Sequence, residues 1–363
     1  MTSIIAKSPM FKKILIINTF GIGDVLFSTP LISNIKRAYP DATVHYLTNP
    51  RSANVLKYNP QIKKILIYER DAFHACYKRS ILEFVGKWKD FLLEIKGGEY
   101  DAVFDLSLDR GMNILTMAAG IKQRIGFNYK NRSFFLTRKI PFSGYEGKHV
   151  VEHYVRLLEE TGIPVIDKDL VLTVPPEDMH WAKKWRSQEA LTFTQLLIAV
   201  FPGGGASWGK SAHLKRWPVE KYVKLVDKMI EKFDAHIILM GNSEERDLCS
   251  QISRVSATNT HVLAGELTLT QSAALLKQCR LAVLNDGGPL HVAVASGVTT
   301  VAIFGPVDER VYGPYPPEKH FVVKKGLACQ PCYRQFRMSN CSHMSCLTQL
   351  HVDDVLRKVE KAL

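Results

Sequence analysis

Residues 281–297 read LAVLNDGGPLHVAVASG, and this stretch decides the fold. An apolar run ends at Asn285 and Asp286, two glycines and Pro289 follow, and a helical pattern then carries His291 in its first turn. Strand, glycine-rich turn and helix start are how α/β proteins present backbone N–H groups to a bound anion. Asp286 stands at the carboxyl end of the strand, where ligands bind in open parallel sheets. On spacing alone, a structural turn in which Asp286 caps the helix is an equal alternative.

The composition predicts a globular protein with acidic partners. The chain has 363 residues, of which 46% are hydrophobic and 23% are charged, so two domains with sizeable cores are expected. The net charge of +13 exceeds what solubility needs and predicts phosphorylated substrates, an anionic lipid surface or nucleic acid as partners. No apolar run approaches the roughly 20 residues that cross a bilayer, and residues 14–17 are too short for a signal peptide. We therefore expect a cytoplasmic protein whose seven cysteines are thiols.

The first half of the chain begins with a predicted strand at residues 13–18, which runs into the loop TFGIGD ending at Asp24. The loop lacks the third glycine of the dinucleotide-binding fingerprint. A helix is expected to about Arg37, starting after or kinked at Pro30. Asp24 either caps this helix or presents a carboxylate at the top of the first strand.

Further strand-like segments alternate with helical patterns along the chain. They lie at residues 43–48, 64–68, 102–106, 124–127, 196–201, 236–240, 261–264, 281–285 and 299–304. This alternation predicts doubly wound parallel sheets, and Pro175-Pro176 marks a domain edge between two such units. Two units of similar size imply a cleft between them. Residues 351–363 carry apolar side chains on one face and predict an amphipathic closing helix.

Residues 204–211, GGASWGKS, match the P-loop pattern G-x-x-x-x-G-K-[ST]. A P-loop lysine opens a long helix whose N-terminus faces the phosphates. Here Pro218 follows Lys210 too closely, so we expect a loop to Trp217 and a helix after it. A P-loop NTPase or kinase stays as an alternative. The loop suits a diphosphate in either case, through Gly204, Gly205, Ser207 and Lys215.

Taken together, these pieces resemble the heptosyltransferase family (glycosyltransferase family 9) of lipopolysaccharide core assembly. Four segments carry the resemblance in the family's order: IINTFGIGDVLFSTPLISNIKRAYP, LKRWPVEKY, MGNSEERDLC and LNDGGPLHVAVASGVTTVAIFGPVDE. The resemblance covers nearly the whole chain and implies an α/β GT-B fold of two Rossmann-like domains. Residues 1–175 would bind the acceptor and residues 176–346 the nucleotide sugar. Residues 347–363 would form a helix that crosses back to the first domain.

The resemblance also assigns roles to single residues. The family's catalytic aspartate falls on Asp24, and the phosphate-binding lysine of its K-x-W-P motif falls on Lys215. The acid expected at the ribose hydroxyls falls on Glu245, with Glu244 adjacent. Gly23, Arg110, Arg124 and Arg132 are the candidates for acceptor binding.

The family's D-[ST]-G-x-x-H motif falls on Asp286, Gly287, Gly288 and His291. Gly287 replaces the usual serine or threonine, so only its backbone N–H can serve the phosphates. His291 as a phosphate donor competes with His291 as a core residue, and the resemblance favours the donor role.

The chemistry of an inverting transfer accounts for these residue types. A carboxylate can take the proton of the acceptor hydroxyl. The leaving ADP gains charge, which a lysine, glycine N–H groups and a helix N-terminus stabilise without metal. We therefore expect no required cofactor.

Four cysteines lie within 18 residues near the C-terminus, at Cys329, Cys332, Cys341 and Cys346. Four thiolates this close would suit zinc or iron. Their spacing is not a double C-x-x-C, and packing thiols are the alternative.

The first hypothesis is thus an inverting transferase that moves heptose from ADP-heptose to the phosphorylated inner core of a lipid-linked saccharide. Its partners would be a nucleotide-sugar donor, an anionic glycolipid acceptor and, peripherally, the cytoplasmic face of the inner membrane. A related transferase with another nucleotide sugar or acceptor, including a protein, is the alternative within the class. A nucleic-acid-binding module is the alternative that charge alone motivates, and we expect no nucleic acid. The sequence indicates neither the acceptor hydroxyl nor the oligomeric state.

Overall fold

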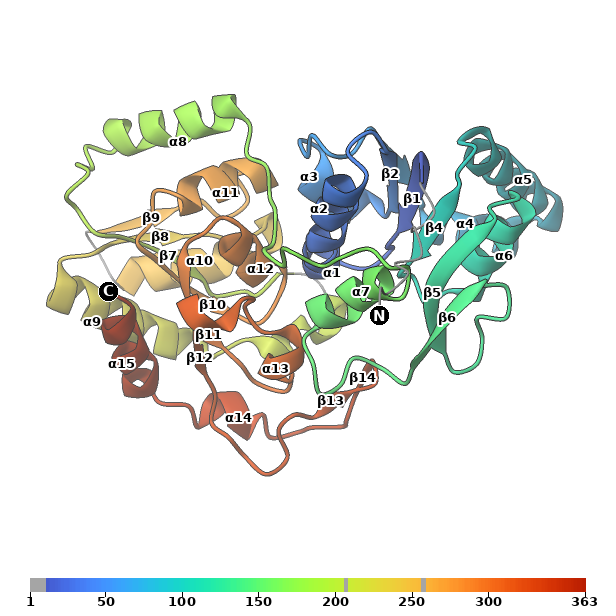
Figure 1. Cartoon of the computed structure of the whole chain (residues 1–363). Coiled ribbons are helices and arrows are strands. Elements are labelled where there is room, and N and C mark those ends of the chain that lie inside the picture. The colour runs from blue at the N-terminus through green and yellow to red at the C-terminus, as the bar shows by residue number, and fades with distance from the viewer. Residues whose placement is uncertain (1–10, 206–207, 256–258) are drawn as a thin grey trace, which may run out of the picture. The chain divides into compact units, whose positions relative to one another are not determined.

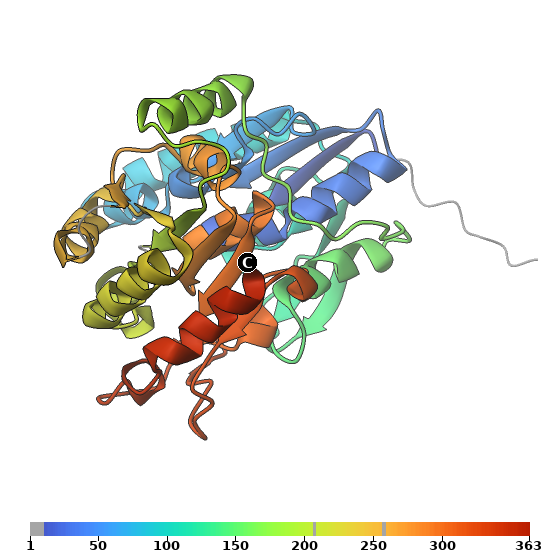
Figure 2. The same cartoon turned by 90° about the vertical axis from the view of Figure 1, so that its left-hand side faces the viewer.

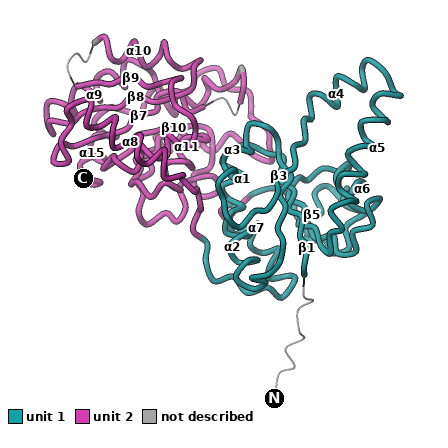
Figure 3. Tube along the Cα trace, turned by 90° about the horizontal axis from the view of Figure 1, so that it is seen from above, with its two compact units in different colours: residues 1–145, 150–168 teal, residues 146–149, 169–363 magenta. Residues whose placement is uncertain are grey.

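The computed structural model describes residues 11–205, 208–255 and 259–363, which form two compact units (Figures 1 and 3). Unit 1 comprises the chain up to residue 145 together with residues 150–168. Unit 2 comprises residues 146–149 and 169–363. Ser207, one of the predicted donor-binding residues, lies outside the described residues.

Unit 1 is built on a parallel sheet in the order β3-β2-β1-β4-β5-β6. Its strands are β1 (Lys13–Ile17), β2 (Thr43–Thr48), β3 (Lys64–Ile67), β4 (Ala102–Asp105), β5 (Gln123–Tyr129) and β6 (Arg138–Phe142). The central strands are apolar on both faces because helices cover both faces. The sequence patterns do not predict β6, whose RKIPF sequence begins with two cations and holds a proline, as suits an edge strand.

The helices of unit 1 are α1 (Ile22–Phe27), α2 (Thr29–Ala38), α3 (Pro50–Leu56), α4 (Arg70–Arg79), α5 (Ile81–Gly97), α6 (Arg110–Ala118) and α7 (Val150–Glu159). The first predicted helix is two helices that meet at Ser28. Pro30 therefore lies in the first turn of α2, where its missing N–H costs nothing. A core of Leu15, Ile17 and Val103 packs against α5 and α6.

Unit 2 repeats the plan with a parallel sheet in the order β12-β11-β10-β7-β8-β9. Its strands are β7 (Leu197–Phe201), β8 (His236–Leu239), β9 (Thr260–Val262), β10 (Leu281–Asn285), β11 (Thr299–Ile303) and β12 (Phe321–Val323). A small hairpin follows, formed by β13 (Tyr333–Arg334) and β14 (Arg337–Met338). The predicted strands of both units are present, with small differences at their ends.

The α-helices of unit 2 are α8 (Pro176–Gln188), α9 (Val219–Phe233), α10 (Arg246–Val255), α11 (Leu269–Leu276), α12 (Gly288–Ala295), α13 (Glu309–Tyr312), α14 (Ser345–Thr348) and α15 (Val352–Ala362). The short 3-10 helices are η1 (Gly209–Lys215), η2 (Ser243–Glu245) and η3 (Pro317–Lys319). Lys210 thus belongs to η1, and the next α-helix begins only at Val219. This arrangement is not that of a P-loop, whose lysine opens the long helix itself.

The final helix differs from its expected position. α15 packs Val355 and Val359 into the core of unit 2, and Figure 2 shows it (red) beside α9 (yellow). The predicted return of residues 347–363 to the first domain is therefore not seen in the described chain. The division between the units also falls after residue 168 rather than 175. Within the described residues, no helix is both long and apolar enough to span a bilayer.

The strand orders place two loops of each unit at a topological switch point. The order reverses between β1 and β4 in unit 1 and between β7 and β10 in unit 2. Loops that follow two such strands run to opposite faces of the sheet and leave a crevice at its carboxyl edge. The loops after β1 and after β7 and β10 are those that the sequence analysis singled out.

Candidate active site

In unit 1, a buried asparagine shapes the loop that carries Asp24. Asn18 follows β1, and its side-chain Oδ1 accepts a hydrogen bond of 3.1 Å from the N–H of Phe20. Its Nδ2 donates to the carbonyl of Asp24 at 3.0 Å. The side chain of Asn49 donates to the carbonyl of Phe20 at 2.5 Å from the neighbouring loop. The glycine-containing turn is therefore held from both sides, which fixes where α1 begins.

Asp24 lies in the first turn of α1, where the positive end of the helix dipole favours a carboxylate. Three tyrosines lie near it within the unit: Tyr46, Tyr145 and Tyr154. Burial raises the pKa of each phenol, and the negative charge of Asp24 raises it further. The phenols therefore stay protonated, and Tyr145 donates to Tyr154 at 3.1 Å. Asp24 is a half-buried carboxylate in a neighbourhood of neutral hydroxyl groups, which suits a proton acceptor.

The predicted acceptor-binding residues have different environments. Gly23 precedes Asp24 in α1, whereas Arg110 and Arg132 are exposed. Arg124 already serves the fold, since its Nε donates to the carbonyl of Phe135 at 2.7 Å and its Nη1 donates to a second carbonyl. Arg110 and Arg132 thus remain the more accessible candidates, and all four assignments stay predictions.

Asp105 is a buried acid at the switch point that the sequence analysis did not single out. It ends β4 beside β1 and accepts hydrogen bonds from the N–H and hydroxyl of Ser107, at 2.9 and 2.6 Å, and from Asn113 at 2.6 Å. Burial raises the pKa of Asp105 to about 6 despite these donors. The sequence does show that an acid stands at the end of a predicted buried strand. Residues 102–106 were predicted only as a strand, so Asp105 was not proposed as a site residue.

In unit 2, two glycines shape the loop after β7, and an asparagine of β10 holds it. Gly204 and Gly205 adopt φ angles of +76° and +79°, which a side chain would strain. Asn285, at the end of β10, accepts a hydrogen bond from the N–H of Trp217 at 3.1 Å and donates to the carbonyl of Pro202 at 2.6 Å. This one buried amide ties both ends of the loop to β10.

Lys215 and Asp286 form a buried ion pair at the switch point. Their Nζ and Oδ2 atoms lie 2.7 Å apart, and both side chains are at least nine-tenths buried. The contact lacks the angles of a hydrogen bond, so its attraction is one of charge. Lys215 also lies over the ring of Trp208, 4.2 Å from its centre. The structure thus brings together two residues that lie 71 positions apart, and it places a cation at the glycine-rich turn.

The turn after Asp286 is built on close backbone approach. Gly287, not Asp286, is the N-cap of α12, so the capping role considered for Asp286 is wrong. Gly287 has φ +158°, and a Cβ there would lie 1.9 Å from the carbonyl oxygen of Gly204. The main chain of one loop therefore occupies the place where this residue's side chain would stand. Gly288, the first residue of α12, presents its N–H at the positive end of the helix.

His291 is buried in the first turn of α12, and burial together with the nearby His149 and Lys215 holds its pKa well below the ordinary value. It is therefore a neutral imidazole, a donor or acceptor rather than a cation. His149 is a neighbour that the sequence analysis missed. Its Nε2 lies 3.0 Å from the carbonyl oxygen of Gly313, and its ring stacks on Tyr315 at 4.6 Å.

The structure separates the two adjacent acids of the predicted ribose site. Glu244 is exposed, whereas Glu245 is 2% exposed and points into the glycine loop. One oxygen of Glu245 accepts from the N–H of Gly205 at 2.9 Å, and the other accepts from Asn242 at 3.0 Å. Glu245 thus supports the glycine loop directly, and its contact with a ribose stays a prediction.

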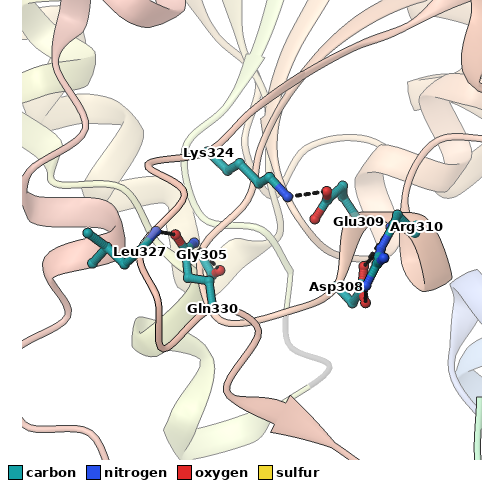
Figure 4. Close-up of polar contacts among 7 residues, drawn as sticks. All are labelled: Gly305, Asp308, Glu309, Arg310, Lys324, Leu327 and Gln330. Carbon is teal, nitrogen blue, oxygen red and sulfur yellow. Dashed lines mark hydrogen bonds and ion pairs between the residues drawn. The ribbon is translucent and has the colours of Figure 1, made fainter. Parts of the chain in front are cut away.

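A second set of contacts joins the loop after β11 to the cysteine segment, residues 329–346, which holds the four clustered cysteines (Figure 4). Gln330 donates to the carbonyl of Gly305 at 2.7 Å and accepts from the N–H of Leu327 at 2.8 Å. Asp308 pairs with Arg310 in the same loop, and Lys324 pairs with Glu309. The loop therefore holds the start of the cysteine segment against the carboxyl end of β11.

The four clustered cysteines are free thiols. Burial and, to a smaller extent, the charges of Cys332, Cys341 and Cys329 raise the pKa of Cys346 to about 11. Nevertheless, no group of three or more histidine, cysteine or acidic residues in the described parts of the chain is arranged to hold a metal ion. The zinc or iron site that their number suggested is therefore not formed among these side chains.

The tripeptide Asp167-Lys168-Asp169 has the D-x-D spacing of metal-dependent transferases, so the sequence alone does not exclude a metal. In the structure, Lys168 pairs with Glu152 at 2.7 Å. The backbone of Asp167 hydrogen bonds with the side chain of Asn34 through both its N–H and its carbonyl. The tripeptide therefore serves as a structural connection at the end of unit 1.

A cavity of about 530 Å³ lies elsewhere in unit 2. Arg186, Leu197 and Arg280 are among the residues that line it, so it opens at the amino ends of β7 and β10. That edge is opposite to the switch point, and the cavity does not belong to the candidate site.

Comparisons with known proteins agree with this arrangement. The model of a family described as glycosyltransferase family 9 (heptosyltransferase) matches residues 89–343, more than half of the chain. The chain is 25% identical over 309 residues to lipopolysaccharide heptosyltransferase 2 of Escherichia coli K12, covering 81% of this chain and 83% of that protein.

Two solved structures share the fold. A glycosyltransferase family 9 protein of Veillonella parvula covers 99% of both chains with a TM-score of 0.79 and 21% identity. The ADP-heptose lipopolysaccharide heptosyltransferase II of Escherichia coli has a TM-score of 0.73 and 21% identity, and covers 96% of this chain and 98% of its own. The two parallel sheets are therefore the two Rossmann-like domains of a GT-B protein.

Proposed function

The chain belongs to glycosyltransferase family 9 and is a glycosyltransferase, and we propose that it transfers heptose from ADP-heptose to the phosphorylated inner core of lipopolysaccharide with inversion. The relatives named above as lipopolysaccharide heptosyltransferases motivate this donor and this acceptor. The observation that carries the proposal is the buried Lys215–Asp286 pair beside the close-packed glycines Gly204 and Gly287.

The donor half of the proposal rests on that pair. The ammonium of Lys215 is compensated by Asp286 while the site is empty, so its burial is tolerated. An entering diphosphate would share the ammonium with Asp286 and accept N–H groups from Gly287 and Gly288 at the start of α12. These groups would stabilise the second negative charge that ADP gains as it leaves.

The acceptor half of the proposal rests on Asp24. Its carboxylate would take the proton of the attacking hydroxyl while a new bond forms from that oxygen to the anomeric carbon. The bond between the anomeric carbon and the diphosphate breaks at the same time, and the electron pair leaves with ADP. The neutral phenols near Asp24 would not compete for this proton.

We place the reaction at the cytoplasmic face of the inner membrane, with peripheral attachment. A lipid-anchored, phosphorylated acceptor requires the enzyme to approach an anionic surface. The net charge of +13 supports such an approach.

The test is a donor panel followed by a transfer assay. ADP-heptose, ADP-glucose, UDP- and GDP-sugars are compared by thermal shift, with magnesium and with EDTA. We expect stabilisation by the ADP-sugars in both buffers and transfer only from ADP-heptose to a heptose-deficient inner core. A shift with UDP- or GDP-sugars alone would refute the donor, and a strict need for magnesium would refute the metal-free mechanism.

A related transferase with another donor or acceptor is the second candidate. The observation that favours it is Gly287, which stands where the resembling family motif expects serine or threonine, because the donor cradle would then differ next to the phosphates. The same panel decides between the two.

A further inference from the structure

A helical hairpin in unit 1 carries apolar side chains that its core does not use. Helices α4 and α5 meet at Ser80, and their junction projects from the unit (Figures 1 and 3). We propose that the tip of this hairpin, residues 77–89, is the element that docks on an anionic lipid bilayer. This inference rests on the proposed function, because a lipid-linked acceptor makes membrane contact necessary.

The first observation is that the hairpin is already fully packed on its inner side. Phe91 and Ile95 of α5 and Phe73 of α4 are buried in the core of unit 1. Trp88 closes this layer against Phe73, with ring centres 5.2 Å apart, and Phe84 stacks edge-on against Tyr77 at 5.3 Å. These contacts fix the hairpin without Ile81, Leu82 or Val85.

The second observation is what the outer side presents. Leu82 is 80% exposed and Ile81 is 60% exposed, and Val85 and Tyr77 are also more than half exposed. All four lie in the last turn of α4 or the first turns of α5. Ile81, Leu82 and Val85 are spaced to share one face of α5, and exposed apolar side chains gathered in this way mark an interaction site when polar residues surround them.

The third observation is the charge around the patch. The tip contains four cations, Lys78, Arg79, Lys87 and Lys89, against the single acid Glu83. Glu83 pairs with Arg79, so the lysines set the sign of the surface. The apolar side chains alone would suit a protein partner equally well. The positive charge around them favours an anionic bilayer instead. Docking would insert Ile81 and Leu82 between headgroups, with the lysines at phosphate level and Tyr77 at the interface.

Vesicle flotation of the full chain without donor or acceptor tests the proposal. The vesicles contain phosphatidylcholine with or without 30% phosphatidylglycerol, in about 150 mM salt, and we expect binding to the anionic vesicles. Ile81→Ser with Leu82→Ser should lower that binding at least about tenfold, even if the two side chains insert only in part. Lys78→Gln with Lys89→Gln should lower it by roughly fivefold per cation.

The matched control is Ile166→Ser with Phe193→Ser, which removes two equally exposed apolar side chains outside the tip. It should bind vesicles as the wild type does. Circular dichroism and the ADP thermal shift confirm that each variant is folded. Absence of wild-type binding, or equal loss in the control, would overturn the proposal. Concentration-dependent self-association that disappears with Ile81→Ser and Leu82→Ser, without vesicle binding, would show instead an interface between two copies.

A second assay separates this inference from the proposed function. The hairpin variant should lose transfer to an acceptor embedded in vesicles and keep transfer to the deacylated, soluble acceptor saccharide. If the wild type transfers heptose to neither acceptor but binds anionic vesicles through the tip, the proposed function fails and the docking surface stands. If the hairpin variant transfers to both acceptors at the wild-type rate, the docking surface fails.

Discussion

The switch points of the two units occupy the same place in the same fold and carry opposite chemistry. In unit 1 the loop after the central strand presents a half-buried carboxylate, Asp24, among phenols that burial keeps neutral. In unit 2 the corresponding edge presents a buried ammonium, Lys215, which Asp286 compensates. The first arrangement places a carboxylate among neutral hydroxyl groups. The second arrangement places a buried cation where an incoming anion can compete with Asp286 for it.

The two edges nevertheless share one structural device. A fully buried asparagine stands at the end of a central strand in each unit, Asn18 after β1 and Asn285 in β10. Each amide donates and accepts within its own loop region, at distances between 2.6 and 3.1 Å. The comparison teaches that the fold supplies a rigid loop anchor at both places, and that the residues beyond the anchor decide the sign of the site.

The largest expected effect concerns the base. Asp24→Asn keeps the size of the side chain and removes its ability to take a proton. Turnover should fall about 10²–10⁴-fold, which is the usual contribution of a positioned general base. The dissociation constant of ADP, measured by calorimetry, should not change, because the nucleotide cradle belongs to unit 2. A variant that lost ADP affinity in step with turnover would show that the two edges are not separate in function.

The next effect concerns the buried ion pair. Lys215→Met removes the ammonium and leaves Asp286 buried without compensation, so the free energy of unfolding should fall by about 3–5 kcal/mol. Lys215→Met with Asp286→Asn should recover most of that stability and none of the affinity for ADP. Denaturant unfolding and calorimetry measure the two quantities. Equal stability loss in the single and double variants would mean that the pair is not coupled.

A smaller effect is expected where two loops touch. Gly287→Ser introduces the hydroxyl that the family motif would predict here, but its Cβ would meet the carbonyl oxygen of Gly204 at 1.9 Å. The free energy of unfolding should fall by about 2 kcal/mol and ADP should bind more weakly, because the loop must move. Gly297→Ser is the control, since that glycine has φ +79° and open space around its Cβ position. A gain in ADP affinity with Gly287→Ser would contradict the close approach.

The smallest effect concerns the buried acid of unit 1. The pKa of Asp105 is about 6 in the folded chain against 3.8 without the fold, so folding favours its protonated form. The contribution of Asp105 to the free energy of unfolding is therefore complete below pH 4, and it is lost as the pH rises through 6 and the folded chain releases the proton. Asp105→Asn should therefore flatten the pH dependence of unfolding between pH 4 and 6. At pH 7 it should add on the order of 1–2 kcal/mol, because the roughly 3 kcal/mol that the pKa shift represents is offset in part by the hydrogen-bond acceptor that the amide lacks. Unfolding curves across that range, with the wild type in parallel, test the sign.

The sequence was sufficient to predict those parts of the candidate site that consist of contiguous residues. The GIGD loop, the glycine loop and the DGG turn each follow an apolar strand, and strand order then brings them to the switch points. The resemblance to a family extended this to Lys215, which spacing alone does not connect to Asp286. The late start of the next α-helix, at Val219, also followed from Pro218, which left no room for a P-loop helix, whereas the 3-10 helix η1 was expected as a loop.

The sequence was insufficient where tertiary contacts make the residue what it is. His149 and Asp105 each become notable only through what buries them, and neither belongs to a motif. The choice between Glu244 and Glu245 likewise depends on which acid the 3-10 turn η2 directs at Gly205. The closing helix α15 has the predicted amphipathic pattern, but such a pattern fixes the buried face and not the surface that receives it.

The path of the chain between the units has a consequence for how this enzyme can be divided or recombined. Residues 146–149 belong to unit 2 although unit 1 continues on both sides of them, so the backbone passes from one unit to the other three times. A fragment that starts at residue 169 would lack His149 and, with it, the ring that stacks on Tyr315. Neither unit can therefore be obtained as a complete domain by cutting the chain at a single position. A chimaera that exchanges donor specificity between relatives should carry this tetrapeptide together with the C-terminal half.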